Sequence, residues 1–594
     1  MQTETSFFDG HSIHFLNSLK RTVFSKPLYA VVLIIFSACL SASQVLGLWL
    51  DGEMASSCFW VFWGLILLVF IIATLVAHMV LYFQYEVGEA ETNKGEASEV
   101  LAASAVATKA RVSLKAWGII SVVLLISFTI TYLMNFPGTY SNDSLDSINI
   151  ALGQAPLSNA HPVLYTAFVA LFVHIGLAFG NIEIGLVLYC IVQMILCATV
   201  LSYTCCWLKK MGAPTLAVLA AVAFFTFNPI IARYSFTMWK DIPFSLCFVL
   251  VVLLLFELVL VPKRFLASKQ RCVTLALFVL LSCLLRNNAL YALLLTVIVL
   301  AITFRRTFIA WVPSAVAVVL AFVITGPIYT ATGVQPSPFR ESVGIPIQQI
   351  AAVLSEDADI NDQEKATLSN MVDLEAAAQA YTPTSSNPVK YHESFNDEWL
   401  NTHKREFLAT WLEIGLKNPK LYLKAWLWET RGYWDIQTQD HIVVGPTGYT
   451  DDGRNLIYDA TGLSLTGGDA SSQYDGLRMS TVASPLFCLA WAVWFVAGAL
   501  VLRFISKQRR AALPLIPFVG LWATLMIAAP YYCEFRYLYA LQLALPVIII
   551  TMFLKSNTAT NDTNETGEAA SSCDVHGAGG KVADSYGVNV ARQE

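Results

Sequence analysis

Long, uninterrupted apolar blocks are the feature that most constrains how this chain can fold. Blocks of about twenty apolar residues recur along the 594-residue sequence, and each is long enough to cross the hydrocarbon core of a bilayer as a helix. A helix satisfies its own backbone hydrogen bonds, which lipid cannot do, so the blocks predict a helical bundle in a membrane. Charged residues make up only 13% of the chain, too few for an ordinary soluble enzyme.

We therefore expect an all-α polytopic membrane protein with about twelve transmembrane helices and an inserted, mostly helical outer domain. The two blocks beside Arg286 are short, so they are either half-helices or one tilted unit. The stretch 161–179 is also apolar, but counting it as a span would move every later loop to the opposite side of the membrane. We therefore predict an interfacial or re-entrant helix there, with an ordinary span as the alternative. The predicted spans are 28–50, 59–83, 117–136, 184–208, 215–234, 242–261, 273–285, 289–304, 308–327, 481–502, 513–529 and 538–554.

Lys and Arg are concentrated in every second loop, and the alternate loops are nearly bare of them. The positive-inside rule places the basic loops in the cytoplasm. Both termini are then expected to be cytoplasmic, in a multi-pass protein of the cell membrane. The first apolar block is too long for a cleavable signal peptide and is interpreted as a signal anchor.

This topology divides the chain into five segments. The acidic segment 328–480 carries 21 acidic and 11 basic residues and no Cys, so it has no disulfide framework, and nothing in the chain indicates nucleic-acid binding. The segments are 1–115 (N-terminal cytoplasmic segment, two extra spans and a polar cytoplasmic loop), 116–327 (membrane core with an acidic first outer loop, 137–182), 328–480 (extracytoplasmic domain), 481–555 (last three spans) and 556–594 (disordered cytoplasmic tail).

Four basic residues break the alternation by lying in short outer loops, namely Arg233, Lys240, Arg286 and Arg536. Each is at a predicted helix end, where a cation can meet a lipid-linked phosphate. The alternative for any one of them is snorkelling to the interface or contact with helix carbonyls. Four together in otherwise cation-free loops favour an anion site.

Two carboxylates lie in the first outer loop. If the chain is helical after Asn142, then Asp143 and Asp146 share one polar face, because residues three apart are neighbours on a helix. Such a pair can accept a proton from a hydroxyl or bind a divalent cation through oxygen. Helix capping is the structural alternative for these acids.

Three further polar residues are candidates near the membrane boundary. Asp241 begins a later span, where a charge requires a partner or water. The structural alternative to a site role is an ion pair of Asp241 with Lys240 or Arg233. For Glu534 the alternative is an internal ion pair with Arg536. His161 on its own is more typical of a structural hydrogen bond than of a base.

The order of these motifs resembles the GT-C class of membrane glycosyltransferases, which includes protein mannosyltransferases, aminoarabinose transferases and oligosaccharyltransferases. The chain also looks like uncharacterised multi-spanning proteins of Gram-positive bacteria related to that class, through segments 344–350 and 418–434. It departs from the class in having one Pro after His161 and its large outer domain before the last three spans. The matching motifs are Asn142-Asp143-Ser144, His161-Pro162-Val163-Leu164-Tyr165, Lys240-Asp241-Ile242-Pro243 and Arg536-Tyr537-Leu538.

The resemblance implies sugar transfer from a polyprenyl-phosphate donor to an acceptor hydroxyl at the outer face of the membrane. Asp143 would be the general base, and Lys240 and Arg536, with Arg233 or Arg286, would stabilise the leaving phosphate. Asp241, with Asp143, would orient the acceptor or hold Mg²⁺ or Mn²⁺. The acceptor would be a cell-envelope glycan, lipid or protein. The alternatives are a transporter or flippase of a lipid-linked or anionic substrate, and a non-enzymatic membrane assembly protein.

Overall fold

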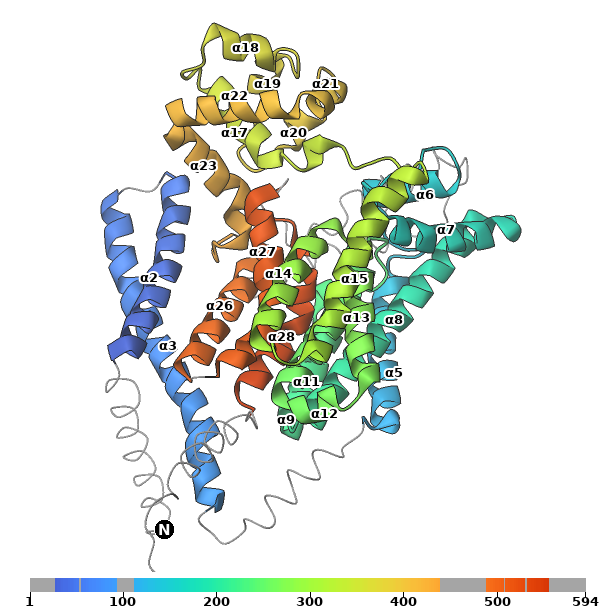
Figure 1. Cartoon of the computed structure of the whole chain (residues 1–594), viewed down its shortest axis with the longest axis vertical. Coiled ribbons are helices and arrows are strands. Elements are labelled where there is room, and N and C mark those ends of the chain that lie inside the picture. The colour runs from blue at the N-terminus through green and yellow to red at the C-terminus, as the bar shows by residue number, and fades with distance from the viewer. Residues whose placement is uncertain are drawn as a thin grey trace, which may run out of the picture.

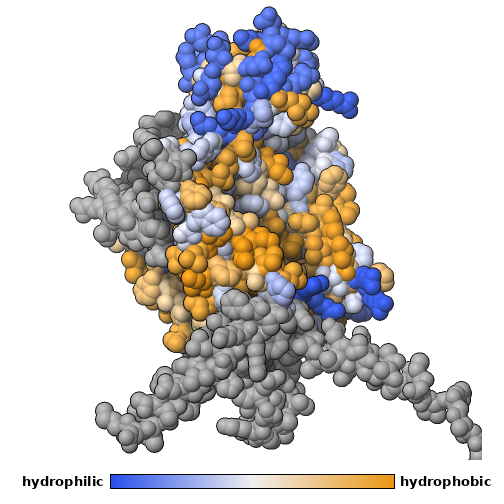
Figure 2. Space-filling view, turned by 90° about the vertical axis from the view of Figure 1, so that its left-hand side faces the viewer, coloured by the Kyte–Doolittle hydropathy of each residue, from blue (hydrophilic) through white to orange (hydrophobic). Residues whose placement is uncertain are grey.

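The computed structural model describes residues 27–52, 55–92, 112–438, 488–506, 508–528, 531 and 533–554. Within these residues the chain is helical, with isolated bridges and no strand. Eight helices are long and apolar enough to cross a membrane, so the prediction of a polytopic helical membrane protein is confirmed. Figure 2 shows the result as an apolar band below a polar domain.

An N-terminal hairpin, α2 (Pro27–Leu50) and α3 (Ala55–Thr92), lies beside the main bundle (Figure 1). It meets the bundle where the ring of Phe36 packs edge-on against Trp494, with centroids 5.9 Å apart. The helix α3 continues nine residues past the predicted end at 83, as far as Thr92. The rest of the predicted polar loop, 93–111, lies outside the described residues, as do the segments 1–26 and 555–594.

The main bundle is organised around α11. In this helix 78% of the spanning stretch is buried, whereas in α3 only 6% is, so α11 is central and α3 is peripheral. Large apolar side chains on the outer helices are exposed, as expected where lipid replaces water. The bundle helices are α5 (Leu114–Leu133), α8 (Ile182–Lys210), α9 (Thr215–Phe227), α11 (Asp241–Leu260), α13 (Lys269–Leu285), α14 (Asn287–Thr303), α15 (Val312–Val323), α26 (Leu489–Ile505), α27 (Ile516–Ala528) and α28 (Tyr539–Met552).

One predicted span, 215–234, is broken in the structure. The helix α9 ends at Phe227, and α10 (Pro229–Tyr234) follows as a separate short helix. The Asn228 side chain accepts hydrogen bonds from the backbone N–H groups of Ile230 and Ile231, 3.0 and 3.2 Å long. An Asn cap followed by Pro at the first helical position starts a new helix, which explains the break.

The two short blocks beside Arg286 are neither half-helices nor one tilted unit. They form two separate 17-residue helices, α13 and α14, that pack against each other. Arg286 joins them in an extended conformation, with φ −154° and ψ 124°. The reversal at this residue carries its side chain toward Asp241, as described below.

The predicted boundary at 327 also moves. A π-helical turn, Ile324–Ile328, takes Pro327 inside the helix and joins α15 to α16 (Tyr329–Ala331), so one continuous helical stretch runs from Val312 to Ala331. A wider turn accommodates the missing N–H of Pro, which is why the helix does not stop there. The last two spans begin as 3₁₀ helices, at Arg509–Leu515 and Phe535–Leu538. The start of the predicted span 481–502 lies outside the described residues up to 487.

Two helices, α6 (Asn142–Ala151) and α7 (Val163–Ala178), lie across the direction of the bundle at the end nearest the polar domain (Figure 1). This is the orientation expected for an interfacial helix. The close contact of α7 with α8 requires glycine, because a Cβ on Gly185 would lie 2.1 Å from the Phe172 carbonyl oxygen.

The polar domain has a core of its own, which includes Ile347, Leu368, Phe407 and Ile414. It stands at one end of the bundle, and α23 leads from it back toward α27 (Figure 1). The last part of the predicted domain, 439–480, lies outside the described residues. The domain's helices are α17 (Gly344–Ser355), α18 (Asp362–Leu368), α19 (Leu374–Ala380), α20 (Asn387–Lys390), α21 (Asp397–Thr402), α22 (Lys404–Lys417) and α23 (Pro419–Thr430).

Candidate functional site

Three hydrogen bonds join the chain at the start of α6 to the residues just before α11. The backbone N–H of Met238 donates to the Thr139 carbonyl at 3.0 Å, and the Ser144 hydroxyl donates to the Met238 carbonyl at 2.7 Å. The indole N–H of Trp239 donates to the Ser141 hydroxyl at 2.7 Å. Two segments that are far apart in the sequence are thereby held side by side, and each contributes a charged side chain to the site.

The chain is helical from Asn142 to Ala151, which meets the condition set for the two acids, and Asp143 is in the first turn of this helix. Reciprocal side-chain to backbone hydrogen bonds between Ser141 and Ser144 close this turn. Asp143 and Asp146 are on one face, and His161 completes a group of three whose possible metal-ligating atoms lie within 4.8 Å of one another. The His161 Nε2 is 3.1 Å from the Asp146 carboxylate.

The Asp143 carboxylate accepts a hydrogen bond from Arg536 at 2.5 Å. The Arg536 guanidinium lies 4.7 Å from the centre of the Trp239 ring and 5.4 Å from that of Tyr537. Its Nε is 3.4 Å from Glu534, so the ion pair named as the structural alternative for Glu534 is present. Two aromatic rings and two carboxylates therefore fix one cation in the 3₁₀ helix that precedes α28.

The surroundings of Asp143 and Glu534 shift the pKa values of these two carboxyl groups in opposite directions. Burial alone would raise the pKa of Asp143, but the charges of Arg536, Lys240 and His161 outweigh burial and hold this pKa well below its usual range. Because 29% of the Asp143 side chain is exposed, water weakens both effects. Burial and the neighbouring charge of Asp143 raise the pKa of Glu534. One carboxyl is thus held ionised beside another that retains its proton more readily, a separation that is common in acid–base sites.

Lys240 lies at the junction of this cluster with the loop between α6 and α7. Its ammonium group is 3.4 Å from the Ala160 carbonyl, and burial lowers its pKa while the charge of Asp143 opposes that effect. Two further hydrogen bonds hold this loop. The side-chain amide of Asn287 donates to the Asn159 carbonyl at 2.9 Å, and the backbone N–H of Asn159 donates to the Gln335 carbonyl at 2.8 Å. Lys240 is therefore positioned by a rigid loop.

Arg286 and Asp241 form a buried, hydrogen-bonded ion pair next to this cluster. The ring of Tyr537 contacts both arginines, with the Arg286 guanidinium 4.9 Å from its centre. The Asp241 partner is therefore Arg286, not Lys240 or Arg233 as the sequence alternatives had it. Asp241 is not part of the group of three possible metal ligands, so the geometry does not support the predicted pairing of Asp143 with Asp241 around a cation.

Arg233 is placed differently from the other three predicted cations. It is 1% exposed, donates to the Asn135 side chain and lies 5.8 Å from the ring of Phe236. These contacts join α10 to the end of α5. Arg233 therefore has a clear role in positioning the loop that carries Lys240.

A cluster in the polar domain, which the sequence did not reveal, extends the site. The Lys390 ammonium is 2.9 Å from the Glu341 carboxylate, the Tyr391 hydroxyl donates to the same carboxylate at 3.0 Å, and Arg340 lies 4.6 Å from the Tyr391 ring. The charge of Glu341 acts on Lys240, and that of Asp143 acts on Tyr391. Glu341 and Lys390 are 49 residues apart in an acidic segment, with no motif to connect them. The aromatic partners of Arg536 were easier to find, because Trp239 is next to Lys240 in the sequence and Tyr537 is next to Arg536.

Fold and site together define a polytopic helical membrane protein with a cluster of ion pairs where the bundle meets its polar domain. The protein belongs to the family described as "Family of unknown function (DUF6020)", whose sequence pattern matches residues 150–566, more than half of the chain. The matched region contains His161, Lys240, Asp241, Arg286 and Arg536 and begins after Asp143 and Asp146. No curated protein and no solved structure matches the chain.

Proposed function

We propose that this protein is a glycosyltransferase of the GT-C type, which transfers a sugar from a polyprenyl-phosphate donor to an acceptor hydroxyl at the outer membrane boundary. The proposal rests on one observation. The Asp143 carboxylate is paired with Arg536 and lies beside Lys240, where the apolar bundle meets the polar domain. A carboxylate and two fixed cations are the groups that a reaction releasing a lipid phosphate requires.

Donor binding activates the base in this mechanism. The donor phosphate takes the cation Arg536 and competes with Asp143 for it, which removes the interaction that lowers the Asp143 pKa most strongly. The acceptor hydroxyl then attacks the anomeric carbon while its proton passes to Asp143. The bond between that carbon and the phosphate oxygen breaks, and its electron pair remains on the phosphate, where Arg536 and Lys240 stabilise the charge.

The rings of Trp239 and Tyr537 hold the Arg536 guanidinium in place before the donor arrives. Such preorganisation matters because a fixed cation needs no rearrangement when charge develops on the leaving oxygen. A divalent cation, Mg²⁺ or Mn²⁺, would be held by Asp143, Asp146 and His161, whose two carboxylates and one imidazole suit Mn²⁺.

Twelve crossings are part of the proposal. Besides the eight long spans, α13, α14 and α26 have 17 residues each, and α9 with its 13 residues is extended by α10. With these four included, the basic loops lie at the end of the bundle opposite the polar domain, which supports cytoplasmic termini and an outer domain.

The test uses purified protein in detergent and a panel of polyprenyl-phosphate-linked hexoses and pentoses. The proposal predicts release of polyprenyl phosphate from at least one donor, because hydrolysis or transfer needs no sealed compartment. Lys240→Gln is expected to lower this rate by about tenfold or more, whereas the exposed Lys365→Gln is the matched control and keeps it. Donor movement across vesicles without any release in detergent would instead indicate a transporter.

A further inference from the structure

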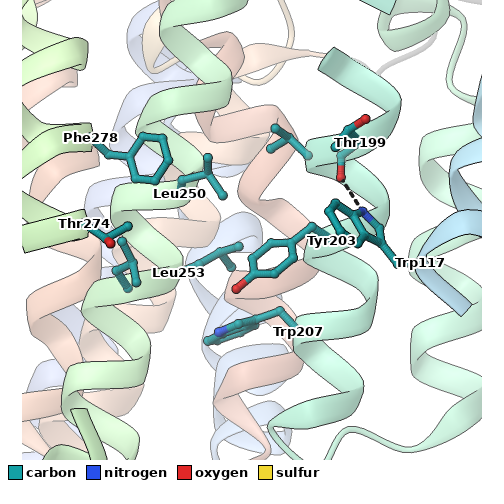
Figure 3. Close-up of a pocket in the computed structure, with 10 residues that line it drawn as sticks. Trp117, Thr199, Tyr203, Trp207, Leu250, Leu253, Thr274 and Phe278 are labelled. Carbon is teal, nitrogen blue, oxygen red and sulfur yellow. Dashed lines mark hydrogen bonds between the residues drawn. The ribbon is translucent and has the colours of Figure 1, made fainter. Parts of the chain in front are cut away.

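A second candidate site is an apolar cavity between α5, α8, α11 and α13. Its volume is about 250 Å³, and Trp117, Thr199, Tyr203, Leu250 and Phe278 are among the residues that line it. Figure 3 shows these side chains around a common space, with Trp207 at its lower edge. The indole N–H of Trp117 donates to the Thr199 carbonyl at 2.9 Å, which closes one wall.

The cavity wall includes a fully buried polar group that needs a partner. Trp207 is fully buried, and its indole N–H has no acceptor among the described residues. A buried donor without an acceptor costs free energy that an occupant with an oxygen atom would recover. A molecule that fits this cavity would therefore be apolar along most of its length and carry an acceptor oxygen near Trp207.

Cations lie one helical turn from the cavity. Lys210 follows Trp207 by three residues on α8, and Arg271 precedes Thr274, another lining residue, by three on α13. Both cations contact the buried carboxylate of Glu257, at 3.1 and 3.0 Å. Two cations share one carboxylate, so this end of the cavity retains positive charge for an anion. We call these two cations the basic rim.

We propose that the cavity and the basic rim bind one anionic glycerophospholipid of the leaflet at this end of the bundle. One acyl chain fills the cavity beside Leu250 and Phe278, an ester carbonyl accepts the Trp207 N–H, and the phosphate meets Lys210 and Arg271. The order of apolar wall, Trp207 N–H and cations along the helices matches the order of chain, ester and phosphate in such a lipid. This site is separate from the proposed glycosyl transfer, and neither depends on the other.

Binding is measured by native mass spectrometry of the purified full chain in detergent, with dioleoylphosphatidylglycerol and dioleoylphosphatidylcholine as probes. The intact protein is expected to bind one phosphatidylglycerol and to prefer it to phosphatidylcholine by about fivefold or more. Leu250→Trp fills the cavity and is expected to weaken binding of both lipids by about tenfold. Arg271→Gln is expected to remove the preference between the two headgroups.

Matched controls separate this site from general lipid adhesion and from misfolding. Leu277→Trp adds the same ring on an exposed face of α13, and Arg306→Gln removes an exposed cation from another basic turn. Both are expected to bind lipid as the wild type does. Trp207→Phe keeps the packing but removes the donor, and it should weaken binding by about threefold. Equal binding of the two headgroups by the wild type, or unchanged binding by a folded Leu250→Trp protein, would overturn the proposal.

Discussion

At the scale of single residues, Arg536 connects the site. It donates to Asp143, contacts Glu534 and lies over the rings of Trp239 and Tyr537. A guanidinium can make all of these contacts at once because it is planar and has several donors in fixed directions. An ammonium cannot, so the site depends on the kind of cation as well as on its charge.

Arg536→Lys tests this dependence. The change keeps the charge but loses the stacking and the fixed donors, and it is expected to lower donor turnover by about a hundredfold. Turnover is measured as polyprenyl-phosphate release, with donor binding measured in parallel. Arg405→Lys makes the same change at an exposed position in α22 and should be silent. Equal turnover in both variants would contradict the assigned role of Arg536.

Glu429 gives a prediction of pH dependence. This residue of α23 is fully buried, and burial raises its pKa to about 8, although Ser386 and Lys390 oppose the rise. The unfolded chain has the ordinary value of about 4.3. Between these two values the folded protein binds more protons than the unfolded one, so its stability falls as the pH rises from about 4 to about 8.

Glu429→Gln removes this proton linkage while keeping the shape of the side chain. The melting temperature of the variant is expected to exceed that of the wild type by about 3 °C at pH 8, and the gap should shrink toward pH 5. The measurement is a pair of thermal unfolding curves at each pH. A gap that grows on acidification would show that Glu429 is ionised in the folded protein.

At the scale of elements, the N-terminal hairpin is attached to the domain end of the bundle by an ion-pair network. Arg431 donates to both carboxylate oxygens of Asp51 at 2.6 Å and to Asp435 at 2.8 Å. Asp51 lies in the turn between α2 and α3. The network therefore joins the tip of the hairpin to the segment that follows α23.

Gly47 tests how closely α2 must approach this network. A Cβ at this position would lie 2.2 Å from a carboxylate oxygen of Asp435, so Gly47→Ala is expected to separate the elements and lower the melting temperature by a few degrees. Gly64→Ala on α3 meets open space and should not destabilise the protein. Limited proteolysis and thermal unfolding of the two variants measure the difference. Similar behaviour of both would show that the hairpin is not held at Gly47.

The sequence predicted most of the elements because each long apolar block has one physical solution in a membrane. It failed where local chemistry decides the path of the backbone. A new helix starts at Asn228-Pro229, whereas the helix continues through Pro327 by means of a π-helical turn. A hydropathy pattern does not distinguish these two prolines. The short blocks beside Arg286 were ambiguous because the ion pair with Asp241, which accompanies the reversal, joins distant parts of the chain.

The candidate site was predictable in its residue types but not in its pairings. Excess charge at helix ends identified Asp143, Lys240 and Arg536, which the structure brings together. It could not separate them from Arg233, which contacts Asn135 and Phe236. Such pairings depend on which helix ends become neighbours, and that is a property of packing, not of local sequence.

At the scale of the whole molecule, the proposed topology places the polar domain outside and the basic loops inside. Lys417→Cys in the domain and Lys263→Cys at the basic end test it in a background in which the native cysteines are replaced. A membrane-impermeant maleimide is expected to label only the domain position in intact cells and both positions after lysis. Labelling of Lys263→Cys alone in intact cells would invert the topology.

The central claim is that Asp143 and its neighbouring cations act together on a lipid phosphate at the outer boundary. The most direct measurement is the rate of polyprenyl-phosphate release by purified Asp143→Asn protein in detergent, beside wild type and the exposed Asp362→Asn control. Loss of the base predicts a rate about a hundredfold or more below wild type, with donor binding kept and the control unchanged. Release at the wild-type rate by Asp143→Asn would contradict the account.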